Sequence, residues 1–86
     1  MLTTRQQVYG ALDSERFYQE YRWRGHKHSL TEYVVYMEDY LAELKHLASR
    51  RDESEVAKEL SDIMRKVTAL GVASLEEHGV NRRAGW

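Results

Sequence analysis

The chain has 86 residues, of which 42% are hydrophobic and 31% charged, and its net charge is -1. This composition predicts one globular domain over residues 1–86. It excludes an intrinsically disordered chain and a strongly basic surface, so we do not expect duplex DNA as a partner. The absence of cysteine excludes disulfides. No apolar run approaches the roughly 18 residues of a membrane span, and the first residues lack the apolar core of a signal peptide. We therefore expect a cytoplasmic protein without a membrane partner.

The first helical segment is expected over residues 4–23. The chain has no proline and only five glycines, which favours helices over sheets throughout. Thr4 and Gln7 have the spacing of an N-terminal capping box. Gly10 and the pair Asp13–Ser14 predict a division of this segment into two short helices, because these residue types disfavour a helix interior.

The second and third helices are expected over residues 29–49 and 53–78, followed by a tail over 79–86. Ser29 and Glu32 form a capping box at the start of the second helix, and Asp52 can cap the third. Each helix carries apolar residues at alternating spacings of four and three. These stripes are Leu30, Val34, Met37, Leu41, Leu44 and Ala48 on the second helix, and Val56, Leu60, Ile63, Val67, Leu70 and Ser74 on the third. The short connection predicts an antiparallel helical hairpin.

Both long helices also carry a second apolar face. Its members are Tyr33, Tyr36, Tyr40 and Leu47 on the second helix, and Met64, Gly71, Val72 and Leu75 on the third. The first segment is too short to cover both faces, and an isolated domain of this size buries only about 60% of its unfolded surface. We therefore predict an all-α homo-oligomeric bundle that associates through one of these faces. In the alternative, the tyrosines pack beneath the first segment of the same chain.

Acidic residues occur at regular spacing in "MEDYLAEL" and "KELSDIM". These two stretches resemble the paired acidic motifs of MazG-like all-α nucleotide pyrophosphohydrolases, although Tyr40 stands where that family has a second glutamate. The resemblance implies a magnesium site formed by Asp39, Glu43, Glu59 and Asp62. Magnesium prefers such oxygen ligands, and spacings of three or four place two of them on one helix face.

Helix periodicity gives these carboxylates a second interpretation. On an ideal helix Asp39 points away from the main stripe and Glu43 lies roughly 130° from it, so the four carboxylates do not converge within one hairpin. A solvated helix face is the simpler reading for Asp39 and Glu43, and Glu59 can be a neighbour of Lys66 at the edge of the core. The chain has no cysteine nucleophile, nucleophile elbow or glycine-rich phosphate loop, which favours a protein without catalysis.

Cationic and aromatic residues gather in "RWRGHKH" and "HGVNRRAGW". An antiparallel hairpin brings the two stretches to one pole, where arginines can bind phosphate and aromatic rings can stack on a base. The predicted ligand-binding residues are Arg22, Trp23, Arg24, His26, Lys27, His28, Arg82 and Arg83. Each also has a structural interpretation, with Trp23 as a core anchor, the histidines solvated and the tail frayed. The histidines could also bind zinc, which the surrounding cations disfavour.

The stretches "SERFYQEYRW" and "RKVTALGVASLEEHGVNRR" resemble small helical proteins encoded by tailed phages and prophages. The resemblance implies an origin in a phage and action in the cytoplasm of its host. We therefore expect a cofactor-free protein that binds a nucleotide or another phosphate-bearing small molecule and sequesters a nucleotide signal of host defence. The first alternative is a MazG-like magnesium-dependent pyrophosphohydrolase. The second is an interaction protein that binds a host protein through surplus apolar surface.

Overall fold

The computed structural model describes residues 3–50 and 52–86; positions 1, 2 and 51 of the expected domain lie outside the described residues. Three α-helices follow one another: α1 (Arg5–Trp23), α2 (Leu30–Arg50) and α3 (Glu53–His78). None of the described residues forms a β-strand. The all-α class predicted from the sequence is confirmed.

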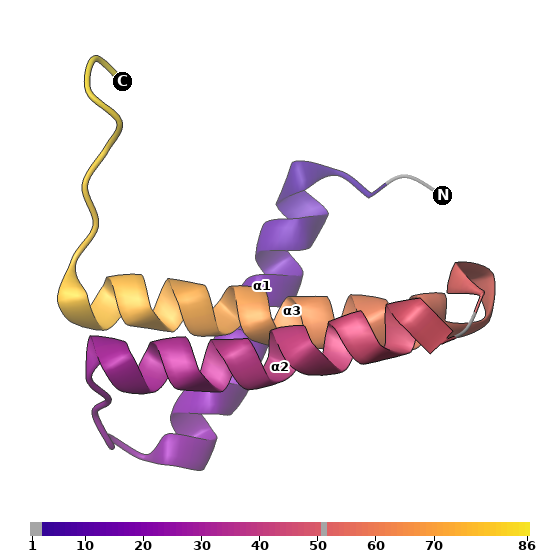
Figure 1. Ribbon diagram of the computed structural model, residues 1–86. Helices are drawn as coiled ribbons and strands as arrows, with labels where there is room; N and C mark the ends of the chain where they lie inside the picture. Colours follow the sequence, from indigo (N-terminus) through magenta and orange to yellow (C-terminus); the bar gives the residue numbers. More distant parts are fainter. Residues whose placement is uncertain (1–2, 51) are drawn as a thin grey trace.

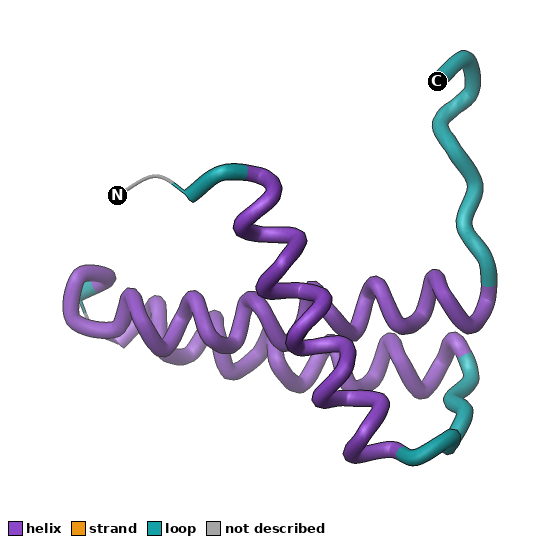
Figure 2. The backbone as a smooth tube through the Cα atoms, turned by 180° about the vertical axis from the view of Figure 1, so that it is seen from behind, coloured by secondary structure: helices purple, strands orange, loops and turns teal. Residues whose placement is uncertain are grey.

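Helix α3 is the element on which the other two rest. Helices α2 and α3 lie side by side and run in opposite directions, and α1 crosses behind them in the view of Figure 1. From the opposite side, Figure 2 shows α1 in front of the pair. Among the described residues, α1 packs on α3 and makes no close backbone contact with α2. The backbones of α1 and α2 therefore stay apart, and these two helices can approach each other only through their side chains.

The helix ends follow local capping chemistry. At α1 the Thr4 side chain accepts a hydrogen bond from the Gln7 backbone N–H at 3.2 Å, and the Gln7 side chain accepts one from the Thr4 N–H at 2.8 Å. Ser29 and Glu32 make the same reciprocal pair at α2, at 3.1 and 2.9 Å. Asp52 caps α3. These bonds occupy backbone donors that a helix start leaves free, so the predicted boundaries agree closely with the structure.

Helix α1 is continuous, and the predicted division at Gly10 and Asp13–Ser14 is wrong. One interior glycine costs only about 1 kcal/mol relative to alanine, which tertiary contacts can offset. The ion pair between Glu15 and Arg65 of α3, at 2.9 Å, lies directly after the expected break. A charge anchored to the neighbouring helix therefore holds α1 in one piece through this region.

The stripe predicted on α3 is the centre of the core. Val56, Ile63, Val67 and Leu70 are buried, and Leu60 and Ser74 are partly buried. Two small residues, Ala69 and Ala73, are also buried and add a second contact face to the helix. Ala73 packs with Leu70 and with Tyr33 of α2 in one buried cluster.

The stripe predicted on α2 is only partly correct. Met37 and Leu44 belong to the core, but Leu30, Val34 and Leu41 are 57%, 59% and 50% exposed. Tyr33, Tyr40 and Leu47 replace them in the core, which rotates the buried stripe by about 60° at about 100° per residue. Two of the tyrosines thus pack within their own chain. The physical reason is the phenol at position 33, which buries its ring and keeps a hydrogen-bond partner for its hydroxyl.

Candidate ligand-binding cleft

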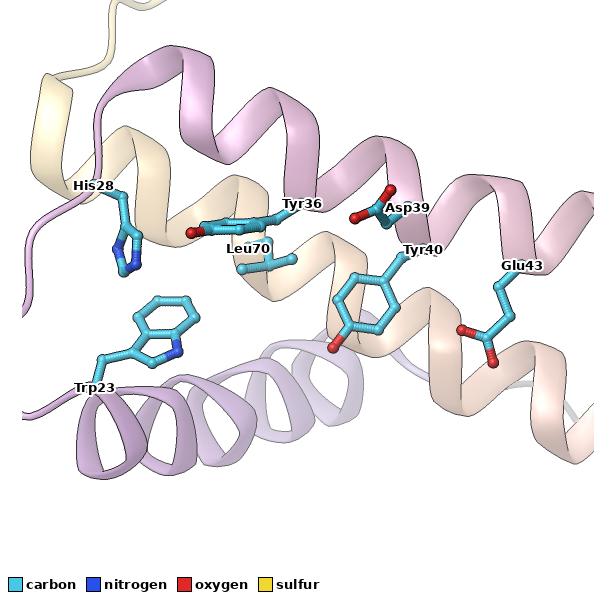
Figure 3. A pocket seen from close by; sticks show the side chains of 7 residues that line it. All are labelled: Trp23, His28, Tyr36, Asp39, Tyr40, Glu43 and Leu70. Atoms are coloured by element: carbon cyan, nitrogen blue, oxygen red, sulfur yellow. The ribbon is translucent and has the colours of Figure 1, made fainter.

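A cleft of about 380 Å³ opens between α1 and α2, and we call it the aromatic cleft. Figure 3 shows its lining side chains, which converge from both helices and from the connection between them. They are Trp23, His28, Tyr36, Asp39, Tyr40, Glu43 and Leu70. Leu70 of α3 forms the floor, so the position of the cleft follows from the way α1 and α2 rest on α3.

Aromatic contacts surround the His28 ring. Its centroid lies 4.9 Å from that of Trp23 and 5.4 Å from that of Tyr36, with both pairs close to an edge-on geometry. The buried Tyr33 ring also lies 5.4 Å away. Edge-on pairs at these distances are favourable because the positive ring edge meets the negative face of its neighbour. The end of α1 and the start of α2 are therefore joined through one imidazole.

The last turn of α3 holds His28 in place. Glu77 accepts hydrogen bonds from the His28 backbone N–H at 2.9 Å and from the Tyr33 hydroxyl at 2.6 Å. His78 donates from Nε2 to the His28 carbonyl at 2.7 Å. The bond from Tyr33 lowers the pKa of Glu77, and burial raises the pKa of Tyr33 to about 12. At neutral pH the network therefore contains an ionised Glu77 and a neutral phenol.

One nitrogen in the cleft wall lacks a partner. His28 Nδ1 is buried and forms no hydrogen bond with any described residue, and no other buried side-chain nitrogen or oxygen of these residues shares that condition. Buried polar atoms are nearly always paired, with water if not with protein.

A second, more basic hollow adjoins the aromatic cleft. It shares Trp23 and Tyr40 with that cleft, and Arg22 and Lys66 are among its other lining residues. We call this second hollow the basic lobe. Arg65 also lines it but is bonded to Glu15 and Asp62. None of the ion pairs among the described residues involves Arg22 or Lys66. The two hollows adjoin at Trp23 and Tyr40. Asp39 and Glu43 line only the first, and the one carboxylate that lines the second, Glu15, is paired with Arg65.

The predicted basic pole is divided in the structure. Trp23 and His28 lie in the aromatic cleft, and Arg22 lies in the basic lobe. His26 and Lys27 line a separate hollow beside Trp23, next to the α3 carboxylates.

Arg24, the remaining member of that stretch, ends α1 in the left-handed region, with φ 46°. Its guanidinium lies 5.2 Å from the Tyr21 ring centroid, outside both hollows.

The C-terminal tail leaves the helices. Gly79 ends α3 with a φ of 97°, a conformation that glycine adopts without strain. From there the chain runs away from the α1–α2 connection in both views (Figures 1 and 2). Arg82 and Arg83 lie on this tail and are exposed. The structure does not bring them to the cleft.

The four carboxylates of the magnesium hypothesis are also separated. Asp39 and Glu43 line the aromatic cleft, and Glu59 is exposed. Asp62 accepts a hydrogen bond from Arg65 at 2.8 Å, which lowers its pKa. Within residues 3–50 and 52–86, no three histidine, aspartate or glutamate side chains come close enough to hold a metal ion.

Sequence reasoning missed the role of Asp39 and Glu43 as cleft walls. Their signal was the position on either side of Tyr40, on the α2 flank that also carries Tyr36.

None of the helices in the described part of the chain is long and apolar enough to cross a membrane. Comparison with protein-family models, curated proteins and solved structures found no match to this chain.

Proposed function

We propose that the protein binds a nucleotide without catalysis, with the base in the aromatic cleft and the phosphate at the basic lobe. The observation that carries this proposal is the shared position of Trp23 and Tyr40. These rings come from two helices whose backbones make no close contact, and each lines both hollows. A ligand that uses both must combine a flat ring with a charged group, as a nucleotide does.

The aromatic cleft supplies stacking surface. A base on an aromatic side chain contributes about 1–3 kcal/mol, and its π-face needs no particular hydrogen-bond pattern. Trp23 is half-buried and its ring is fixed against His28. A ring that is already ordered loses little rotamer entropy on binding.

The basic lobe supplies the phosphate contacts. Arg22 offers a planar fork that can bind two phosphate oxygens, and Lys66 adds a compact positive charge. Neither side chain is committed to an ion pair with another described residue. The ligand class is the one expected from the sequence, but its phosphate contacts lie on α1 and α3. The resemblance to phage proteins supports a role in sequestering a nucleotide signal.

Isothermal titration calorimetry with a panel of mono-, di- and cyclic nucleotides tests the proposal. We expect Trp23→Ala and the pair Arg22→Ala/Lys66→Ala each to weaken binding at least tenfold. Arg83→Ala, on the tail, is the matched control and should leave affinity unchanged. Binding that is lost with Arg83 and kept without Arg22 and Lys66 would contradict the site. Magnesium-dependent hydrolysis that Glu59→Ala abolishes would favour the pyrophosphohydrolase instead.

We also propose that the chain forms a homo-oligomer through a surface that we call the open face, defined by Leu30, Val34, Leu41 and Leu75. Helices α2 and α3 are close together beside this surface, because a Cβ added to Gly71 of α3 would lie 3.5 Å from the terminal methyl of Met37 on α2. All four apolar side chains are about half exposed or more. Exposed apolar surface of this kind is typical of an interaction site.

A second copy is the partner that the charges around the open face favour. Glu38 and Lys45 are seven residues apart and lie on one edge of the α2 stripe at about 100° per residue. A two-fold axis between them pairs each glutamate with the lysine of the other copy, which makes the surface self-complementary. A chain that stays monomeric would instead leave this face for a host protein.

A further inference from the structure

Two carboxylates line the aromatic cleft beside the rings that would hold a base. Asp39 and Glu43 are one turn apart on α2, and in Figure 3 they lie on either side of Tyr40. Neither takes part in an ion pair with a described residue. Both side chains line the opening, and neither carboxylate is committed to a cation of the described residues.

These charges fix the orientation of a bound nucleotide. A phosphate near Asp39 and Glu43 would meet like charges, whereas Arg22 and Lys66 attract it in the adjoining basic lobe. The base is then the part of the ligand that meets the carboxylates. An ionised carboxylate only accepts hydrogen bonds, so it selects a base edge that carries donors.

We infer that the cleft selects guanine among the nucleobases, through a carboxylate of Asp39 or Glu43 that accepts from its Watson–Crick edge. This inference rests on the proposed nucleotide function. Guanine carries two adjacent donors, N1–H and the 2-amino group, that match the two oxygens of one carboxylate. Adenine and cytosine place an acceptor nitrogen beside their amino group, which a carboxylate repels. Hypoxanthine keeps N1–H but lacks the amino group.

The direct test compares GMP, IMP, AMP and CMP by calorimetry under one buffer and salt condition. GMP should bind at least about tenfold more tightly than the other three, because charge-assisted hydrogen bonds are the strong ones. The paired variant Asp39→Asn/Glu43→Gln should reduce GMP affinity to that of IMP and leave IMP and AMP affinity nearly unchanged. A carboxamide has only one acceptor oxygen and cannot receive both guanine donors.

Glu53→Gln is the matched control, because it removes one exposed carboxylate at the start of α3, outside both hollows. It should leave the preference for GMP intact. Asp39 and Glu43 are exposed, so the paired variant should unfold at the same temperature as the natural chain, which circular dichroism can verify.

The outcomes separate the two proposals. If no nucleotide binds, or if spermidine or agmatine binds in its place, both the nucleotide function and the guanine preference are overturned. If all four nucleotides bind equally and Trp23→Ala still weakens them, only the guanine preference fails. A preference for GMP that survives in the paired variant would overturn the assignment to Asp39 and Glu43.

Discussion

The two faces of the α2–α3 pair are covered in different ways. On one face, α1 packs on α3 and is held by ion pairs, Arg16 with Glu76 at 3.0 Å and Glu15 with Arg65 at 2.9 Å. On the open face, leucine and valine side chains remain in contact with solvent. Helix α1 is thus held on α3 partly by charged side chains, whereas large apolar side chains of α2 on the open face are exposed.

The largest difference in stability between the core and the open face is expected when one leucine from each is truncated. Leu70 is 2% exposed and lies under both α2 and the cleft, whereas Leu41 is on the open face. Leu70→Ala should lower the free energy of unfolding by about 3 kcal/mol, because it removes packing and leaves a cavity. Measured on the monomeric chain, where the open face has no partner, Leu41→Ala should change it by about 0.5 kcal/mol or less. In thermal unfolding the first variant should melt roughly 10–20 °C lower. Equal shifts would mean that the open face is not exposed.

The free energy of unfolding should also depend on pH through Glu77. Its pKa is lowered, chiefly by the Tyr33 hydroxyl, so the ionised form stabilises the folded chain. This stabilisation is complete above the ordinary glutamate pKa of about 4.3 and is lost as pH falls through the lower folded value. Tyr33→Phe removes the donor and should cost about 1 kcal/mol at pH 7, and less at pH 3. Urea unfolding at both pH values measures this difference. An equal loss at both would show that the bond does not set the pKa.

The smallest effect on stability, and the largest on assembly, is expected at Val34. Val34→Asp places a charge on the open face and should convert the oligomer to a monomer in analytical ultracentrifugation, because burying an unpaired carboxylate is costly. Val35→Asp is the control, since Val35 is 50% exposed but lies about 100° further around α2. Dissociation by both variants, or by neither, would argue against this interface.

The success of sequence reasoning depended on how local the signal was. Capping boxes and the α3 stripe are set by neighbours along the chain, and both are present in the structure. Helix α2 offers two apolar stripes of similar quality, so its burial is decided by α3, where Glu77 provides a partner for the Tyr33 hydroxyl. No property of the α2 sequence alone identifies that partner.

The candidate site divides in the same way. Trp23 and His28 are near the end of one helix and the start of the next, so short-range geometry was enough to bring them together. Arg82 and Arg83 were expected beside them because a hairpin brings the two chain segments to one pole. The direction of a tail after the positive φ of Gly79 has no periodic pattern to predict it. The position of a carboxylate in a cleft wall depends on the crossing of α1, which sequence periodicity does not specify.

The placement of the two tryptophans gives the cleft its own optical reporter. Trp23 lies at the wall shared by the two hollows, whereas Trp86 is 86% exposed at the end of the tail. Replacing Trp86 with phenylalanine leaves one indole, whose emission depends on what stacks against it. Quenching of that fluorescence would then follow occupancy of the cleft in real time, with no label attached to the ligand or the protein.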